Sequence, residues 1–171
     1  MSEDIKKDKT SGKLTFWMKV EIPLFSKNKY EYDYKRNAIF LDRPLYGCNF
    51  YPGEYGYLLD TEAEEDDGDG LDVLCLAPYQ TFPGCLIEVI VIGVLEMIDD
   101  GKEDWKIIAV PKNDPYTKTI TDIFQLDKHR LDAIKNFFST YKNLEGKKVT
   151  VGSFFSAKVA EEKVKSRFLK K

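Results

Sequence analysis

Along the first third of the chain, apolar and polar residues alternate with the period of two that is typical of half-buried β-strands. The alternation predicts a strand over 14–22 and a hairpin over 30–41 that carries Lys29 and Glu31 on one face. Aromatic residues and chain breakers follow one another over 50–57. Because Pro and Gly interrupt regular strand pairing, this segment is expected to be an ordered loop or an irregular sheet edge.

Continuous apolar and β-branched runs mark the middle of the chain. Segments 71–77 and 85–94 predict buried strands, and 106–110 predicts a further strand that follows a turn. Residues two apart in a strand lie on one face, so Asp104 and Lys106 are expected to point the same way.

Helical spacing appears only in the last third. An apolar stripe follows Asp127, which is a suitable N-cap, and Gly146 is expected to end this helix. A short strand at 149–151 and a second helix over 156–168 complete the pattern. Many short strands followed by one or two helices, without regular βαβ alternation, predict a mainly β protein with some α: a small β-barrel with packed helices.

The composition is that of a globular protein, since 43% of the residues are hydrophobic and 32% are charged. A chain of 171 residues is long enough for one domain with a sizeable core. We therefore expect a single domain over 1–171, in which the polar segment 1–12 is a loose tail.

The formal net charge of −3 gives no overall attraction to nucleic acid or to anionic lipid, so an anionic substrate must be captured locally. The longest apolar stretch, 86–95, is far shorter than the roughly 20 residues that a membrane helix needs. Three cysteines without paired spacing and a charged N-terminal segment unlike a signal peptide indicate a reduced, cytoplasmic protein.

His129 is the chain's single histidine, and its position in the predicted helix suggests a solvated surface residue. One histidine and scattered cysteines cannot assemble a zinc site of the usual nitrogen and sulfur ligands, whereas the 29 carboxylates leave oxygen sites for hard cations open. The scarcity of histidine also argues against catalysis by a Ser or Cys nucleophile that a histidine activates as a base.

Asp67, Asp69 and Asp72 lie within six residues, among glycines that permit a tight turn. Two carboxylates about 4 Å apart repel each other by roughly 4 kcal/mol at an effective dielectric constant near 20, so this clustering is costly unless cations bind. A solvated acidic loop is an equally simple interpretation of the run taken alone. An EF-hand is excluded because Leu76 stands where its bidentate Glu is needed and a strand follows.

Basic side chains beside tyrosines or carboxylates favour phosphate binding over a merely solvated loop. Cations and hydrogen-bond donors together grip phosphate oxygens, although each basic residue singly is more often a surface residue. The candidates stand at element ends or on polar faces: Lys29, Arg43, Lys106 and Lys142.

In their order, these motifs resemble those of the soluble inorganic pyrophosphatases, in the short form found in bacteria. The most specific element is Asp67-Gly68-Asp69-Gly70-Leu71-Asp72-Val73. The supporting elements are Glu21-Ile22-Pro23, Lys29-Tyr30-Glu31, Asp42-Arg43, Phe50-Tyr51-Pro52, Tyr55-Gly56, Gly93-Val94-Leu95 leading to Asp99, Glu103-Asp104-Trp105-Lys106, Val110-Pro111, Phe137-Phe138 and Tyr141-Lys142. The resemblance runs from about Trp17 to Leu144, and it is expected to include the C-terminal helix.

The resemblance implies an OB-type five-stranded β-barrel with flanking C-terminal helices, and magnesium-dependent hydrolysis of pyrophosphate to two phosphates without a covalent intermediate. It implies several Mg²⁺ ions per site, for which Mn²⁺ or another hard divalent cation can substitute, and a homohexamer. Asp69 matches the general base that accepts the proton of the nucleophilic water. The implied metal ligands are Asp67, Asp72, Asp99 and Asp104, with Glu21 and Glu31 as supporting acidic residues. The implied substrate-binding residues are Lys29, Arg43, Tyr55, Lys106, Tyr141 and Lys142.

The sequence departs from the family's pattern at Gly70, at Gly53-Glu54 and in the heavier acidic approach 62–66. Two other functions remain open at this point. A barrel of this type could bind single-stranded nucleic acid with Tyr30, Tyr32 and Tyr51 as stacking platforms, although the acidic surroundings oppose this. A nucleotide phosphohydrolase is the other, although the sequence has no P-loop.

Overall fold

The computed structural model describes residues 6–8, 12–62 and 70–169. Five strands close into a barrel in the order β2, β5, β6, β9, β7 and back to β2, and all neighbours are antiparallel except β6 and β9. The barrel strands are β2 (Leu14–Ile22), β5 (Glu54–Leu58), β6 (Asp72–Cys75), β7 (Leu86–Asp99) and β9 (Lys106–Pro111). The prediction of a mainly β, five-stranded barrel is therefore confirmed.

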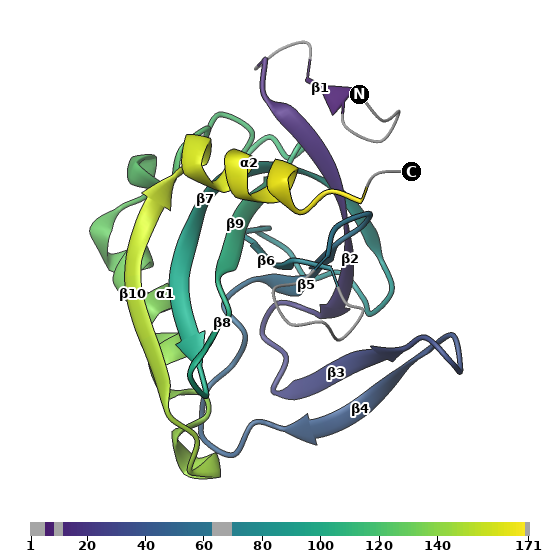
Figure 1. The fold of residues 1–171 in the computed structure, drawn as a ribbon, viewed down its shortest axis with the longest axis vertical. Coiled ribbons are helices and arrows are strands. Elements are labelled where there is room, and N and C mark those ends of the chain that lie inside the picture. The colour runs from purple at the N-terminus through teal and green to yellow at the C-terminus, as the bar shows by residue number, and fades with distance from the viewer. Residues whose placement is uncertain (1–5, 9–11, 63–69, 170–171) are drawn as a thin grey trace.

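Further strands extend this sheet or stand beside it. Strands β1 (Lys6–Lys7), β8 (Lys102–Glu103) and β10 (Val149–Ser156) pair with β2, β7 and β7 respectively. Strands β3 (Asn28–Asp33) and β4 (Ala38–Pro44) form a separate hairpin that projects from the barrel (Figure 1). Lys6 and Lys7 fall within the segment predicted to be a loose tail, and they instead pair with β2.

Helix α1 (Lys128–Thr140) contacts β10, and helix α2 (Ala157–Ser166) lies across one end of the barrel against β7 (Figure 1). Asp127 caps α1 as predicted, and its side chain accepts a hydrogen bond from the Arg130 amide at 2.9 Å. The helix ends at Thr140, before Gly146, because a short 3₁₀ turn η2 (Asn143–Glu145) intervenes, and Gly146 closes that turn with φ 71°. A second 3₁₀ turn, η1 (Ile123–Gln125), precedes α1.

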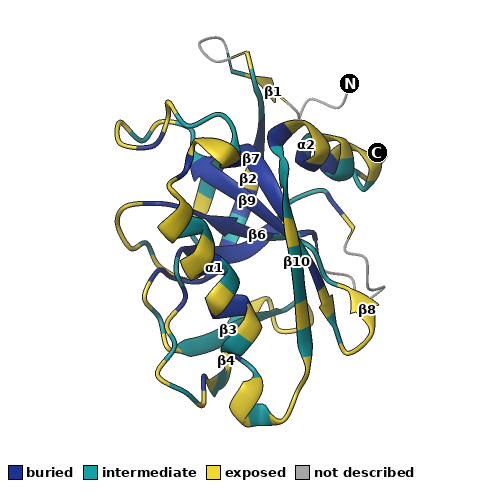
Figure 2. Cartoon of the chain, turned by 90° about the vertical axis from the view of Figure 1, so that its left-hand side faces the viewer, coloured by how far each residue is buried: buried dark blue, intermediate teal, exposed yellow. Residues whose placement is uncertain are grey.

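The strands have two apolar faces, because successive side chains point to opposite sides of a sheet. One face gathers Val73, Cys75, Ile107 and Ala109 with residues of α2, which places this cluster inside the barrel and under that helix. Leu74, Leu76, Ile108 and Val110 alternate with them and pack instead against α1. The buried strands at the centre and the exposed outer side of α1 are distinct in Figure 2.

Segment 50–57 differs from its prediction, since Glu54–Leu58 is a fully buried barrel strand. Gly56 explains the difference, because a Cβ atom there would stand 1.9 Å from the Lys19 carbonyl oxygen. The glycine that was expected to break a strand instead allows β5 and β2 to approach closely. His129 is exposed on α1, as predicted.

Candidate active site

A cavity of about 220 Å³ lies where the barrel, the β3–β4 hairpin and the segment after α1 meet. Its polar lining consists mainly of carboxylates, lysines and tyrosines. These residues are Glu21, Lys29, Tyr30, Glu31, Tyr51, Tyr55, Asp72, Asp99, Glu103, Asp104, Lys106, Tyr141 and Lys142.

Two carboxylates of this lining, Asp72 and Asp104, pair with one buried ammonium group, that of Lys106. Val73 of β6 pairs with Ile107 of the parallel strand β9, so Asp72 and Lys106 begin neighbouring strands side by side. Asp104 is two residues before Lys106 and points the same way, as the spacing predicts. The Lys106 Nζ, only 2% exposed, donates hydrogen bonds to both Asp72 and Asp104.

The pKa values of these three groups reflect burial and mutual attraction. Burial and the nearby Asp72 carboxylate together raise the pKa of Asp104 to about 6, against the attraction of Lys106. Burial also acts to raise the pKa of Asp72, but Lys106 and a hydrogen bond from Tyr55 lower it overall. The pKa of Lys106 is raised, because Asp72 and Asp104 more than offset the effect of burial. Lys106 therefore stays charged and neutralises only part of the carboxylate charge.

Asp99 ends β7 and faces the segment that follows α1. Its Oδ2 atom accepts a hydrogen bond from the Lys142 ammonium group. Its Oδ1 atom is buried and has no hydrogen-bond partner in the described part of the chain. A buried carboxylate oxygen without a partner is costly, so this atom is suited to a ligand that brings positive charge.

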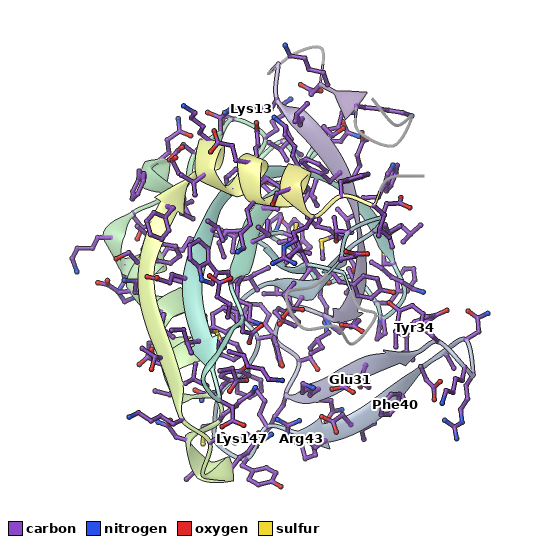
Figure 3. All side chains as sticks on the ribbon, in the orientation of Figure 1. Lys13, Glu31, Tyr34, Phe40, Arg43 and Lys147 are labelled. Carbon is purple, nitrogen blue, oxygen red and sulfur yellow. The ribbon has the colours of Figure 1, made fainter. Side chains whose placement is uncertain are left out.

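The β3–β4 hairpin brings further charged groups to the cavity. Glu21 of β2 accepts a hydrogen bond from the Tyr32 amide at 2.9 Å, which ties β3 to the barrel. The Lys29 ammonium group contacts Glu31 and Asp42. Figure 3 shows Glu31 along this hairpin.

Arg43 lies near the end of β4 and is not among the described residues that line the cavity (Figure 3). The Glu145 carboxylate accepts hydrogen bonds from its Nε at 3.0 Å and from its Nη2 at 2.7 and 2.9 Å. Although burial lowers the pKa of Arg43, its ion pairs with Glu145 and Asp42 raise it overall. The guanidinium therefore remains charged and is held in one orientation.

Tyrosine side chains complete the lining. Tyr51, Tyr55 and Tyr141 are buried, and their rings lie about Phe137 and Phe138 of α1. Burial raises the pKa of each hydroxyl well above its usual value. The three hydroxyls are therefore neutral, and each can donate a hydrogen bond.

A sequence model of the family described as Inorganic pyrophosphatase matches residues 18–170. An inorganic pyrophosphatase of Halalkalibacterium halodurans is 50% identical over 149 residues, which cover 87% of this chain and 90% of the relative. The chain belongs to the inorganic pyrophosphatase family. It is therefore a hydrolase of the inorganic diphosphatase class.

More distant members agree with this assignment. An inorganic pyrophosphatase of Methanosarcina acetivorans is 44% identical over 155 residues, covering 89% of this chain and 91% of the relative. The crystal structure of an inorganic pyrophosphatase from Thermus thermophilus superimposes with a TM-score of 0.85 at 38% identity, covering 96% of this chain and 95% of that chain. The family match extends beyond Leu144 through the C-terminal helix, as the resemblance implies.

The cavity brings together ten of the residues that the sequence nominates: Glu21, Lys29, Glu31, Tyr55, Asp72, Asp99, Asp104, Lys106, Tyr141 and Lys142. Asp67 and Asp69, the expected metal ligand and general base, lie outside the described residues. Seven lining residues have no role in the sequence-based site: Ile22, Tyr30, Tyr51, Gly70, Leu71, Glu103 and Trp105. Tyr51 and Trp105 belong to the quoted motifs, but no periodic pattern reveals which way a loop side chain points.

Tyr51 also bears on the nucleic-acid alternative, for which it is a candidate stacking platform. It is only 1% exposed and packs against Tyr55 and Phe137. A buried ring cannot stack on a base from solvent, so this part of the alternative is wrong.

Within 6–8, 12–62 and 70–169, no three histidine, cysteine or acidic side chains are close enough to hold one metal ion. Asp67, the fourth expected ligand, lies outside those ranges. The described donors nevertheless suit a hard cation, because they are carboxylate oxygens and one of them, Asp99 Oδ1, is buried without a partner. In the same part of the chain, no helix is long and apolar enough to cross a membrane.

Proposed function

We propose that this cavity is the place where the chain splits inorganic pyrophosphate into two phosphates, by attack of a water molecule and without a covalent intermediate. The arrangement of charge carries the proposal. The carboxylates Asp72, Asp99 and Asp104 and the cations Lys29 and Lys142 line one cavity. A phosphoanhydride needs both kinds of group, since metal ions must be held beside its oxygens and cations must balance the charge of the leaving phosphate.

Asp67, Asp72, Asp99 and Asp104 would hold several Mg²⁺ ions, for which Mn²⁺ can substitute. When bound, these ions neutralise the charge on pyrophosphate and lower the pKa of a coordinated water. Glu21 and Glu31 have supporting roles toward further metal or its water shell, and both line the cavity.

Pyrophosphate itself is bound by lysine, arginine and tyrosine side chains. Lys29 and Lys142 provide positive charge from the cavity lining, and Arg43 provides it from the adjoining strand β4, where Glu145 holds its guanidinium. Tyr55 and Tyr141 are neutral donors, and Lys106 balances Asp72 and Asp104 beside the phosphate. Asp69 accepts the proton of the attacking water.

A phosphate-release assay tests this function. Purified protein with excess Mg²⁺ is expected to release two phosphates from each pyrophosphate, to keep part of this activity with Mn²⁺, and to act more weakly on ATP. Single-strand binding that weakens with salt, without any release of phosphate, would favour the nucleic-acid alternative. A preference for ATP over pyrophosphate would instead favour a nucleotide phosphohydrolase.

We also propose that the protein works in the cytoplasm as a homohexamer. Its family relationship supports both statements, and large exposed apolar side chains such as Phe25, Tyr79 and Phe82 suit an interface between copies. Light scattering after size-exclusion chromatography is expected to give the mass of six chains. The mass of one chain at micromolar concentration would contradict the assembly.

A further inference from the structure

Trp105 lies between two residues of the proposed site, Asp104 and Lys106. The side chains of Asp104 and Lys106 meet in an ion pair, so Trp105 is attached to the backbone that sets the position of both. Residues 104 and 105 belong to no strand. The Asp104 amide donates one hydrogen bond of 2.9 Å to the Met97 carbonyl. Strand pairing with β7 holds Glu103 and Lys106 on either side, so contacts of the Trp105 side chain can add restraint to the two residues between them.

The Trp105 ring is held from two other elements. Phe155 of β10 stacks on it with ring centroids 5.5 Å apart and an angle of 5° between the planes. The Lys163 ammonium group of α2 lies 4.2 Å from the ring centroid, and it is 3.9 Å from the Glu103 carboxylate. An aromatic stack and a cation over an indole face are each worth about 0.5–2 kcal/mol, so the two contacts together can restrain the backbone.

We propose that Trp105 is a positioning residue for the metal site, held by the stack of Phe155, Trp105 and Lys163, which we call the indole anchor. The anchor fixes the backbone that presents Asp104 and Lys106 to the cavity. It connects the C-terminal helix α2, which has no residue among those lining the cavity, to the carboxylate and the ammonium group beside the substrate. This inference rests on the proposed role of Asp104 as a metal ligand.

Binding of Mg²⁺ in the absence of pyrophosphate tests the anchor, with isothermal titration calorimetry as the measurement. Trp105→Leu is expected to weaken Mg²⁺ binding about tenfold, because the loss of both contacts frees the backbone beside Asp104. Trp105→Phe keeps an aromatic ring between Phe155 and Lys163 and is expected to stay within about threefold of the wild-type affinity. Lys163→Met removes the charge but keeps the apolar stem, and a loss of about threefold is expected.

Phe168→Leu is the matched control, since Phe168 packs against the same cluster and against Phe16 but does not line the cavity. It is expected to lower the Tm while leaving Mg²⁺ affinity unchanged. An equal loss of affinity in Phe168→Leu and Trp105→Leu would mean that both act only through the stability of the folded protein, and it would overturn the proposal. Wild-type affinity in a folded Trp105→Leu protein would overturn it as well.

Asp104→Asn separates this inference from the function on which it rests. If Asp104→Asn binds Mg²⁺ as tightly as the wild type does, Asp104 is not a metal ligand, and the proposal that the indole anchor positions it for metal binding is wrong as well. If Asp104→Asn weakens binding and Trp105→Leu does not, the proposed function stands and the anchor alone is refuted. Trp105 fluorescence, recorded in a Trp17→Phe background, is expected to change when Mg²⁺ binds.

Discussion

Asp104 is a carboxylate whose burial and whose neighbour Asp72 outweigh the attraction of Lys106, so its pKa rises to about 6 in the folded protein. A raised carboxyl pKa adds stability below the ordinary value of 3.8, and this stability is lost as the pH rises through about 6. In metal-free protein, Asp104→Asn is therefore expected to raise stability by roughly 1–3 kcal/mol at pH 8 and by much less at pH 4. Urea unfolding at both pH values, with a chelator present, measures the difference. An equal effect at both would contradict the raised pKa.

Asp69 and Asp72 are expected to differ in what they do, although only two residues separate them. Asp69→Asn should leave metal binding largely intact and lower the turnover number by roughly 10²–10⁴, the usual contribution of a general base. Asp72→Asn should impair both, because Asp72 is proposed to bind metal and also balances the buried charge of Lys106. Titration with Mg²⁺ and turnover of both variants decide the question, and an identical defect in the two would argue against separate roles.

Glu145 connects two elements that carry proposed substrate-binding residues. It lies in η2, three residues after Lys142, and its bidentate ion pair with Arg43 joins this turn to the hairpin strand β4. Glu145→Gln keeps the shape but weakens the pair, so Arg43 is expected to lose its fixed orientation. We expect the KM for pyrophosphate to rise about fivefold to thirtyfold, with a smaller change in kcat. Arg43→Lys added to the Glu145→Gln variant should raise the KM little further. A full additional rise would contradict the idea that Glu145 acts through Arg43.

Strands β5 and β2 approach each other most closely at Gly56, where a Cβ atom would overlap the Lys19 backbone. Gly56→Ala is therefore expected to cost ~3 kcal/mol or more, because the overlap involves backbone and no side chain can move away. Thermal unfolding measures the loss. Gly101→Ala is a comparison in which steric overlap is absent, since a Cβ atom there meets nothing within 4 Å, and only its φ of 82° is strained.

The sequence-based prediction worked where an element has one apolar face or a continuous apolar run, as in β6, β7 and β9, and it failed where a glycine interrupts the pattern of a strand, as in β5 and β10. The strand 14–22 and the capped helix after Asp127 follow their periodicity closely. Strand β5 lacks any alternation because every residue from Glu54 to Leu58 is buried. Strand β10 runs on to Ser156, past Gly152, where the pattern stops. A glycine in a sequence can mark the end of a strand or a point where two strands approach too closely for a side chain, and the sequence alone does not tell these apart.

At the scale of the molecule, the site depends on contacts between residues that are distant in the sequence. Local patterns could predict that Asp104 and Lys106 share a face, because that relation spans two residues. No local pattern could predict that Asp99 meets Lys142, 43 residues away, or that Arg43 meets Glu145. These pairs follow from the folding of the whole chain. The resemblance to a family nominated Asp99, Lys142 and Arg43 in advance, but not Glu145. The proposed base, Asp69, still rests on that resemblance alone.

Closure of the barrel also determines how the molecule can open. Cys75 of β6 is fully buried in the cluster inside the barrel, and burial raises the pKa of its thiol well above the usual value. Its strand is paired on one side with β5 and on the other with β9. Because β5 and β9 are themselves paired on both sides, β6 cannot separate as an edge strand. Exposure of Cys75 is therefore expected to require opening of the whole barrel. Cys48, by contrast, is exposed in the folded protein.

A thiol reagent such as Ellman's reagent is therefore expected to modify Cys48 rapidly, and to modify Cys75 in proportion to the small globally unfolded fraction of the protein. In a Cys48→Ser, Cys85→Ser variant, the labelling rate of Cys75 should rise with urea along the same slope as equilibrium unfolding, since both report the surface exposed by the whole domain. A shallower slope would mean that β6 can separate from one neighbour while the rest of the barrel stays closed. In that case the strand that begins with Asp72 would be able to move independently of β9, which begins with Lys106, and the ion pair between them would not be a fixed part of the folded protein.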